Sequence, residues 1–283
     1  MADQTFDPDM YTKMLQLTKT YHRDIYPAID PQQKAAGKVV LILGASRGLG
    51  KALAQLWASA GASTLILTAR TLSALDSVTT SIHSTSPHTT VLPLACDVSS
   101  PTAMSALFST LHSRFPTLNT VIANAGVVSQ GSTFPRIGEM SPEDYWTDFE
   151  VNTRGTHLAA HYFVSLFGGK GTFVSVVSGT AAVTMGGLSS YSISKLACIR
   201  MIEHLAIEYP QLRAFALDPG IVRDVAAVEA FMPFAFDTVE LIAAMSIWLD
   251  SSEAAWKLRG GYVHCTWDVE ELEKHADEIE EKG

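Results

Sequence analysis

From Lys38 onward, short apolar runs rich in β-branched residues alternate with longer segments that have helical spacing of apolar positions. Continuous apolar runs separated by helices are typical of a parallel sheet that is covered on both faces. The pattern therefore predicts an α/β fold, a doubly wound parallel sheet of about seven strands flanked by helices. The predicted strands are Val39–Leu43, Thr64–Ala69, Val91–Ala95, Thr120–Asn124, Thr172–Val177, Leu212–Leu217 and Gly261–His264, and the most prominent predicted helices are Pro142–Phe167 and Tyr191–Tyr209.

The two ends of the chain depart from this pattern. Residues 1–36 carry three tyrosines and three prolines around one amphipathic stretch from Tyr11 to Tyr26. We interpret residues 1–36 as an N-terminal lead segment that packs on the main domain or on a partner subunit; a loosely ordered tail is the alternative. Residues 37–283 are expected to form one domain, whose acidic end, Asp268–Gly283, is a solvated helix or tail.

A glycine-rich turn follows the first predicted strand, in the sequence VVLILGASRGLG from Val39 to Gly50, and a helix-like stretch comes next. Glycines at such a turn let the backbone approach a pyrophosphate, which then rests on the helix N-terminus. In open parallel sheets, ligands bind outside the carboxyl ends of the strands. That edge is expected to collect the candidate residues in one crevice: Gly44–Gly50, Arg70, Asp97, Asn124–Gly126, Ser178 and Pro219–Gly220.

Composition narrows the class of protein. With 47% apolar and 17% charged residues among 283, the chain can bury a sizeable core, and its formal charge of −9 disfavours nucleic acid and anionic membrane as partners. Cys96, Cys198 and Cys265 include no CxxC pair, which favours reduced thiols. The sequence shows no signal-peptide pattern and no apolar run of about 18 residues. We therefore expect a soluble, cytoplasmic protein.

Ser178, Tyr191 and Lys195 occur at a spacing used in hydride-transfer chemistry. Lys195 lies one helical turn after Tyr191 on the same face. A free tyrosine has a pKa of about 10, so it needs nearby positive charge to exchange protons near neutral pH. A Tyr-x-x-x-Lys pair or a glycine-rich turn is a weak signal on its own. Together they favour a nicotinamide-dependent oxidoreductase that contains a Rossmann-type domain.

From about Lys38 to Trp267 the chain resembles the short-chain dehydrogenase/reductase family. The order and spacing of seven short segments carry the resemblance, and two of the three asparagines in the chain, Asn124 and Asn152, fall on family positions. The segments are GASRGLG (44–50), CDV (96–98), ANAG (123–126), VN (151–152), VVSG (176–179), YSISK (191–195) and DPG (218–220). The lead segment and the ending GGYVHCTWDVEELEK resemble fungal members that are linked to secondary metabolism.

The resemblance implies four catalytic residues, Asn152, Ser178, Tyr191 and Lys195. Tyr191 would be the general acid in reduction and the base in oxidation. Lys195 would bond the nicotinamide ribose and, with an oxidised nicotinamide, lower the pKa of Tyr191. Ser178 would hold the substrate oxygen, and Asn152, inside the helix after the fourth strand, would position a water that links Lys195 to solvent.

The cofactor is expected to be NADP(H). The second strand ends Leu67-Thr68-Ala69-Arg70, without the acidic residue that bonds the adenosine ribose in NAD-preferring members, and Arg47 and Arg70 could pair with a 2′-phosphate. The alternative is that both arginines are ordinary surface charges. The predicted cofactor-binding residues are Gly44, Ser46, Arg47, Gly48, Leu49, Gly50, Arg70, Asp97, Val98, Asn124, Ala125, Gly126, Tyr191, Lys195, Pro219, Gly220 and Val222.

Two segments follow the last motif. The first departs from the family pattern, and the second carries no motif. The family usually places a threonine shortly after Pro219-Gly220 to bond the nicotinamide carboxamide, but this chain continues Ile221-Val222-Arg223-Asp224. The following stretch, VAAVEAFMPFAFD (225–237), is interpreted as a flexible apolar lid over a substrate pocket. An ordinary apolar loop packed on the core is the alternative.

His157 and His161 are four residues apart in a predicted helix, as in zinc proteases, but the glutamate of that motif is missing because position 158 is Leu158. No metal site is therefore expected. The sequence predicts an NADPH-dependent ketoreductase or alcohol dehydrogenase for a small to medium apolar substrate, forming a homodimer or homotetramer through its long helices. A dehydratase or epimerase that uses the same tyrosine, or a catalytically silent NADPH-binding protein, is the alternative.

Overall fold

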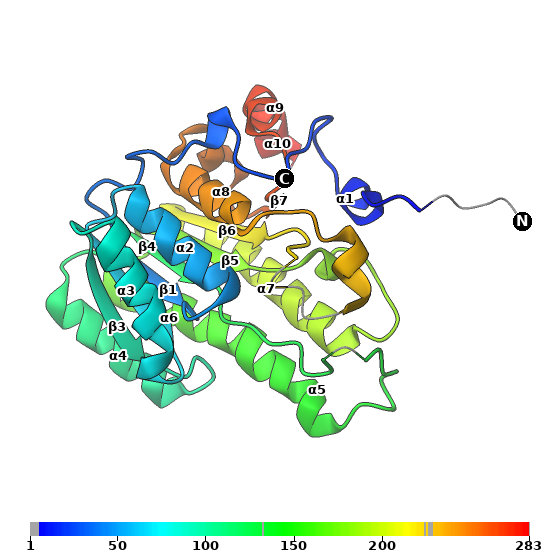
Figure 1. The fold of residues 1–283 in the computed structure, drawn as a ribbon, viewed down its shortest axis with the longest axis horizontal. Helices are drawn as coiled ribbons and strands as arrows, with labels where there is room; N and C mark the ends of the chain where they lie inside the picture. Colours follow the sequence, from blue (N-terminus) through cyan, green and yellow to red (C-terminus); the bar gives the residue numbers. More distant parts are fainter. Residues whose placement is uncertain (1–5, 132, 224, 226–228, 283) are drawn as a thin grey trace, which may run out of the picture.

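The structure, a computed structural model, describes residues 6–131, 133–223, 225 and 229–282. Its centre is a seven-stranded sheet in the order β3-β2-β1-β4-β5-β6-β7, in which every neighbouring pair is parallel (Figure 1). The predicted doubly wound α/β fold is confirmed. The strands are β1 Val39–Leu43, β2 Thr64–Ala69, β3 Thr90–Ala95, β4 Thr120–Ala123, β5 Gly171–Val176, β6 Leu212–Asp218 and β7 Tyr262–His264.

Every predicted strand forms, and no strand end differs from its prediction by more than one residue. Alternate residues of β1 show why the apolar runs are continuous. Val40 and Ile42 belong to one core cluster, whereas Leu41 and Leu43 belong to the other. A strand that is buried on both faces needs apolar side chains at successive positions, and this requirement gives the sequence its strong strand signal.

Helices cover both faces of the sheet. On one face, α2, α3 and α8 bury side chains such as Trp57 and Trp248; on the other, α4, α6 and α7 bury Phe108, Phe163 and Ile202. The α-helices are α1 Met10–Met14, α2 Gly48–Ser59, α3 Asp76–Thr85, α4 Pro101–Arg114, α5 Pro142–Asp148, α6 Gly155–Phe167, α7 Ser189–Glu208, α8 Val239–Ser251, α9 Val269–Lys274 and α10 Ala276–Lys282. Short 3₁₀ turns cover Pro27–Ile29, Leu72–Leu75, Gly179–Ala181, Glu229–Phe234 and Ala254–Leu258.

The long helix predicted from Pro142 to Phe167 is interrupted. A π-helical turn, Phe149–Arg154, separates α5 from α6. Within this turn the carbonyl of Asn152 accepts a hydrogen bond from the Thr156 hydroxyl at 2.7 Å. Turns of this kind are frequent at functional sites, and this one holds Asn152 fully buried beside α7.

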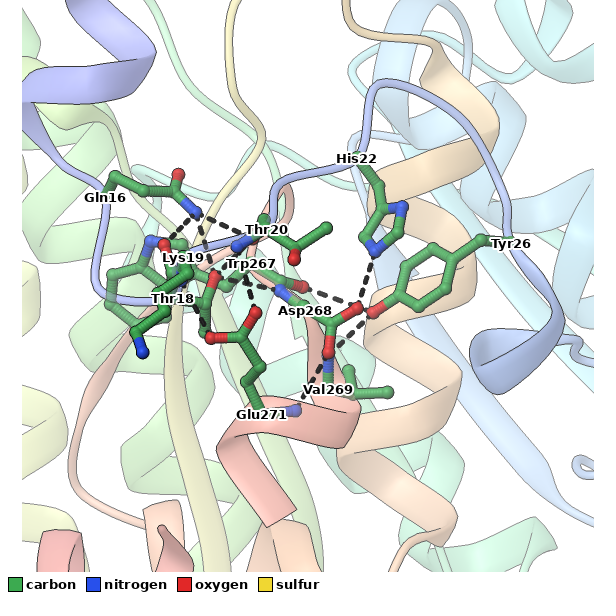
Figure 2. Close-up of polar contacts among 10 residues, drawn as sticks. All are labelled: Gln16, Thr18, Lys19, Thr20, His22, Tyr26, Trp267, Asp268, Val269 and Glu271. Carbon is green, nitrogen blue, oxygen red and sulfur yellow. Dashed lines mark hydrogen bonds and ion pairs between the residues drawn. The ribbon is translucent and has the colours of Figure 1, made fainter. Parts of the chain in front are cut away.

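The described part of the lead segment, residues 6–36, contacts the C-terminal region and does not form one amphipathic helix. Between Tyr11 and Tyr26 only the residues of α1 are α-helical. This segment bonds to residues 267–271, where Asp268 caps α9 (Figure 2). The acidic end is therefore not simply solvated, since Val269 and Leu272 of α9 are buried. That expectation was wrong because it weighed the charges and not the apolar side of α9.

Candidate active site

The glycine-rich turn joins β1 to α2 and is compact because glycines stand where a side chain would not fit. Gly44 and Gly48 have φ of +81° and +53°, which favours glycine. A Cβ added at Gly50 would lie 2.0 Å from the carbonyl oxygen of Gly44, so α2 can approach the strand end only with glycine there. Ser46 lies in this glycine-rich turn, and Leu49 lies in the first turn of α2. No side chain caps the N-terminus of that helix. Its first N–H groups therefore suit a phosphate, as a dinucleotide site requires.

The end of β4 supports this turn. The side-chain amide of Asn124 donates to the carbonyl of Gly44 at 2.8 Å, and a Cβ at Gly44 would lie 2.9 Å from Cα of Ala125. Gly126 is next along the chain, and a Cβ there would lie 3.2 Å from both Asn152 Oδ1 and Lys195 Nζ. Residues 124–126 thus connect the glycine turn to the catalytic candidates.

The candidates for the adenosine end of a dinucleotide lie at the ends of β2 and β3. Arg47 and Arg70 are exposed, and neither forms an ion pair within the described part of the chain. Asp97 is exposed as well, and its carboxylate accepts hydrogen bonds from the backbone and hydroxyl of Ser99 at 2.9 and 2.7 Å. Val98 is buried against Gly155, where an added Cβ would lie 3.0 Å from Val98 Cγ2. Arg47, Arg70 and Asp97 are thus open to a ligand from solvent, whereas Val98 is enclosed by protein.

Lys195 and Asn152 lie behind the cavity wall. The Lys195 ammonium donates to the carbonyl of Val176 at 2.7 Å, and burial lowers the pKa of this lysine. The Asn152 amide donates to the Val127 carbonyl and the Ser194 hydroxyl, and its Oδ1 accepts from the Val127 N–H at 2.8 Å. These hydrogen bonds fix the orientation of the Asn152 side chain.

Tyr191 and Ser178 face each other at the cavity. Burial raises the pKa of the Tyr191 phenol to about 12, and a hydrogen bond from the Ser178 hydroxyl opposes this rise. The negative charges of Asp218 and Asp148 raise it further. The direction is opposite to the lowered pKa expected from Lys195 and an oxidised nicotinamide together. In the protein alone, desolvation is the largest cause of the rise, and Lys195, whose Nζ lies 6.0 Å from the centroid of the Tyr191 ring, does not offset it.

A cavity of about 200 Å³ opens at the carboxyl edge of the sheet. It collects Leu49, Ser178, Tyr191, Pro219, Gly220 and Val222 from the predicted site residues. The other predicted site residues are outside its lining, so the single crevice that was expected is a cavity with neighbouring surfaces. They include Gly44, Arg47, Gly48, Gly50, Arg70, Asp97, Asn124–Gly126, Asn152 and Lys195. Most of the remaining lining is apolar, including Met14, Leu15, Val183, Met185, Leu188 and Phe231.

Two polar lining residues, Asp218 and His264, were not among the predicted site residues. The backbone N–H of Thr266 donates to Nδ1 of His264 at 3.3 Å, and since an N–H can only donate, the neutral ring carries its proton on Nε2. His264 Nε2 lies 3.8 Å from Asp218 Oδ1. The position of Asp218 directly before Pro219 could have indicated it, whereas nothing in the sequence places His264 beside it.

Two carboxylates fix the loop after β6. The Gly220 N–H donates to Asp218 at 2.8 Å, and the Ile221 N–H donates to Asp237 at 2.6 Å. Val222 pairs with Asp237 in an isolated bridge. Gly220 has a φ of +72°, and a Cβ there would lie 2.2 Å from Asp237 Oδ2.

The segment predicted as an apolar lid, residues 225–237, is described in part, since residues 226–228 lie outside the described residues. Phe231, in the 3₁₀ turn Glu229–Phe234, lines the cavity. Met232 and Phe236 are 38% and 46% exposed, so this segment is not an ordinary loop buried in the core.

His157 and His161 are exposed on α6 with ring centroids 6.1 Å apart. Across the described ranges, no three histidine, cysteine or carboxylate side chains are grouped to hold a metal ion. All three cysteines are free. Among the helices that the structure describes, none is long and apolar enough to cross a membrane.

This parallel sheet carries a glycine turn at its first strand and a Ser–Tyr–Lys set at its carboxyl edge. The arrangement is typical of nicotinamide-dependent oxidoreductases. The family model for short chain dehydrogenases matches residues 38–231. The chain therefore belongs to the short-chain dehydrogenase/reductase family, as the sequence motifs predicted.

Several fungal proteins are similar over almost the whole chain. The short chain dehydrogenase mpl6 of Monascus purpureus is 33% identical over 93% of this chain and 92% of its own length. The short chain dehydrogenase andI of Emericella variicolor is 32% identical over 93% and 92%. The short chain dehydrogenase tazN of Aspergillus terreus is 33% identical over 93% of this chain but only 60% of its own. These relatives confirm the resemblance to fungal members.

Solved structures show the same fold at lower identity. A short-chain dehydrogenase/reductase from Mycobacterium marinum superposes with a TM-score of 0.73 at 24% identity, covering 83% of this chain and 96% of its own. One from Pseudomonas syringae gives 0.76 at 21% identity, covering 87% and 100%. Such structures are covered almost completely while part of this chain is left over, so the common fold does not account for every segment here.

Proposed function

We propose that this protein is an NADP(H)-dependent oxidoreductase that interconverts an apolar ketone or aldehyde and the corresponding alcohol. The observation that carries the proposal is the meeting of Ser178 and Tyr191 at one cavity, with Lys195 buried directly behind it. Acid–base groups beside an apolar pocket suit proton transfer to a carbonyl oxygen.

Each side chain has a distinct task in this proposal. Tyr191 delivers its phenolic proton to the substrate oxygen in reduction and removes a proton in oxidation. Ser178 donates a hydrogen bond to the same oxygen, which stabilises the negative charge that develops there. Lys195 supplies the positive charge that favours the tyrosinate. A bound nicotinamide supplies or accepts the hydride.

The glycine turn, the capless N-terminus of α2 and residues 124–126 would hold the dinucleotide. NADP(H) is favoured over NAD(H) because Arg47 and Arg70 are exposed and β2 ends without a carboxylate. A planar guanidinium pairs well with a phosphate and gains nothing comparable from a ribose hydroxyl. We therefore attribute the preference for NADP(H) to Arg47 and Arg70, which can be changed separately.

We also propose that two or four copies of this chain assemble. Exposed apolar side chains on two helices support this proposal. On α5, Trp146 is 60% exposed, and on α7, Leu196 and Ile207 are 49% and 77% exposed. Large apolar side chains gathered on helices mark candidate contact surfaces. We also propose a cytoplasmic location. The fungal origin of the relatives supports our further proposal of a place in fungal secondary metabolism.

The decisive experiment replaces the phenolic hydroxyl. Tyr191→Phe is expected to lower turnover of apolar ketones by about a thousandfold, while NADPH binding, followed by nicotinamide fluorescence, changes less than about twofold. Tyr162→Phe is the matched control, because Tyr162 packs on Phe108 outside the cavity. Retained turnover in Tyr191→Phe would exclude the acid–base role.

The parent protein separates the alternatives. NADPH binding without reduction of any ketone would favour a silent binding protein, and loss of water or inversion of a substrate centre without net oxidation would favour a dehydratase or epimerase. Binding of neither NADPH nor NADH would mean that the glycine turn is only structural.

A further inference from the structure

Residues 6–23, named the N-terminal strap here, lie outside the part of the chain that the family model matches. Four strap residues nevertheless line the cavity that holds Ser178 and Tyr191: Tyr11, Thr12, Met14 and Leu15. We propose that the strap is a wall of the substrate pocket and that Tyr11 and Leu15 determine which apolar substrates fit. This inference rests on the proposed function and extends it to the substrate class.

The strap reaches the catalytic groups themselves. A Cβ added at Gly179, the residue after Ser178, would lie 2.5 Å from Leu15 Cδ1. Leu15 therefore packs directly on the backbone that presents the Ser178 hydroxyl. A substrate whose oxygen reaches Ser178 and Tyr191 must pass its apolar part close to Leu15.

Aromatic contacts join the strap to the segment after β6. The Tyr11 ring meets Phe231 and Phe234 edge-on, with centroids 5.4 and 4.7 Å apart, and Phe6 lies 5.3 Å from Phe234. Edge-on aromatic pairs stabilise each other beyond the area they bury. The strap and the 3₁₀ turn Glu229–Phe234 thus form one apolar surface, in which neither part is complete without the other.

Hydrogen bonds to the C-terminal region hold the strap in place (Figure 2). Both carboxylate oxygens of Glu271 accept backbone N–H bonds, from Lys19 at 2.8 Å and from Thr20 at 2.9 Å. The indole N–H of Trp267 donates to the carbonyl of Leu15 at 2.9 Å. The Asp268 N–H donates to the Thr18 hydroxyl at 3.1 Å. Because these bonds use the strap backbone on both sides of residue 17, they fix the direction in which Leu15 enters the cavity.

An ion pair fixes the strap to the loop after β6. Arg23 donates to Asp237 at 2.7 Å and also pairs with Asp9. Asp237 is 3% exposed, and its other oxygen accepts the Ile221 N–H. A buried carboxylate is costly without its cationic partner, so the strap and this loop are expected to move together.

The lining chemistry defines the substrate class. Tyr11, Met14 and Leu15 contribute aromatic, thioether and aliphatic surface, with no charged side chain among the strap residues in the cavity. Such a wall favours a carbonyl compound that carries an extended apolar or aromatic part and disfavours a charged one. Methyl ketones with a short second substituent would leave the wall uncontacted.

A series of straight-chain methyl ketones, from 2-butanone to 2-undecanone, tests this wall. Tyr11→Ala and Leu15→Ala are expected to raise KM about tenfold for the long members and to leave 2-butanone within about twofold, because each truncation removes apolar contact. NADPH affinity should not change. Leu17→Ala is the matched control, since Leu17 is 59% exposed and does not line the cavity. Equal effects of all three variants along the series would overturn the proposal.

Binding is measured in parallel, by saturation-transfer NMR of the same ketones with the NADP⁺-loaded protein. If the parent binds long ketones without reducing them, the proposed function fails, while weaker binding of those ketones to Leu15→Ala still supports the wall. If parent and variants bind the whole series equally, or bind none of it, the wall is refuted.

A stability cycle tests the contact without any ligand. Gly179→Ala is expected to lower Tm because the new methyl group meets Leu15, and adding Leu15→Ala should restore part of the loss. Strictly additive changes in Tm would show that Leu15 does not pack on Gly179 in solution.

Discussion

The proposed nucleotide side and the proposed substrate side of this protein are built in different ways. The proposed nucleotide side depends on close backbone approaches, such as the 2.0 Å that would separate a Cβ at Gly50 from the Gly44 carbonyl oxygen, and on the Asn124 amide that bonds the same carbonyl. The substrate side depends on side chains from distant parts of the chain, including Leu15, Phe231 and His264. A site made from backbone geometry tolerates almost no change, whereas one made from side chains can change its preference residue by residue.

A pair of glycine substitutions tests this comparison most directly. Gly50→Ala is expected to lower the free energy of unfolding by about 3 kcal/mol, because the new Cβ meets backbone that cannot move aside. NADPH binding should be lost with it. Gly186→Ala, in the loop before α7, has no atom within 4 Å of its new Cβ, so its effect should be within about 0.5 kcal/mol.

Urea unfolding and NADPH titration measure both variants. A Gly50→Ala protein that remains as stable as the parent and binds NADPH would mean that the turn is looser than this structure, and that the two sides differ less than argued.

Tyr191 stands between the two sides, and its titration sharpens the comparison. Burial raises its pKa to about 12, so the neutral phenol is favoured and the tyrosinate should be absent from the cofactor-free protein up to about pH 10. NADP⁺ is expected to move this titration to lower pH, since its positive charge adds to that of Lys195. Alcohol oxidation should then rise about tenfold per pH unit below the new pKa, because the base form is required.

Tyrosinate absorbance, with Tyr191→Phe subtracted, measures the ionisation directly. An unchanged titration after NADP⁺ addition, or oxidation that does not vary with pH, would separate the proton-transfer step from the cofactor side.

The smallest expected effect concerns Arg70. Arg70→Ala should weaken NADPH binding by about tenfold and leave NADH within about twofold, because only the 2′-phosphate gains a charge-assisted hydrogen bond. Arg136→Ala removes the same charge from an exposed side chain in another loop and serves as the control. Equal weakening of both cofactors by Arg70→Ala would show that Arg70 does not distinguish them.

The sequence predicted the parts of the molecule that are locally determined. The strands were found because burial on both faces requires continuous apolar runs, as in β1. The glycine turn was found because Gly44, Gly48 and Gly50 directly follow an apolar strand, so that the whole signal lies within residues 39–50. Ser178, Tyr191 and Lys195 were brought together as expected, although their roles remain predictions.

Other features depend on contacts that have no local signal. The π turn around Asn152 interrupts a segment whose apolar spacing fits one helix. The strap meets residues about 250 positions later, and His264 meets Asp218 only because β6 and β7 are neighbours. The raised pKa of Tyr191 comes from burial in the assembled cavity. Each of these follows from tertiary packing, which spacing along the chain does not describe.

The bond between Lys19 and Glu271 spans 252 positions, which sets an order of events during synthesis. The strap leaves the ribosome before the sheet, but its anchor at residues 267–271 emerges only after all seven strands have been made. At synthesis rates of about 5–20 residues per second, the strap waits roughly ten seconds or more for this anchor. The proposed substrate pocket is therefore among the last parts of the protein to be completed.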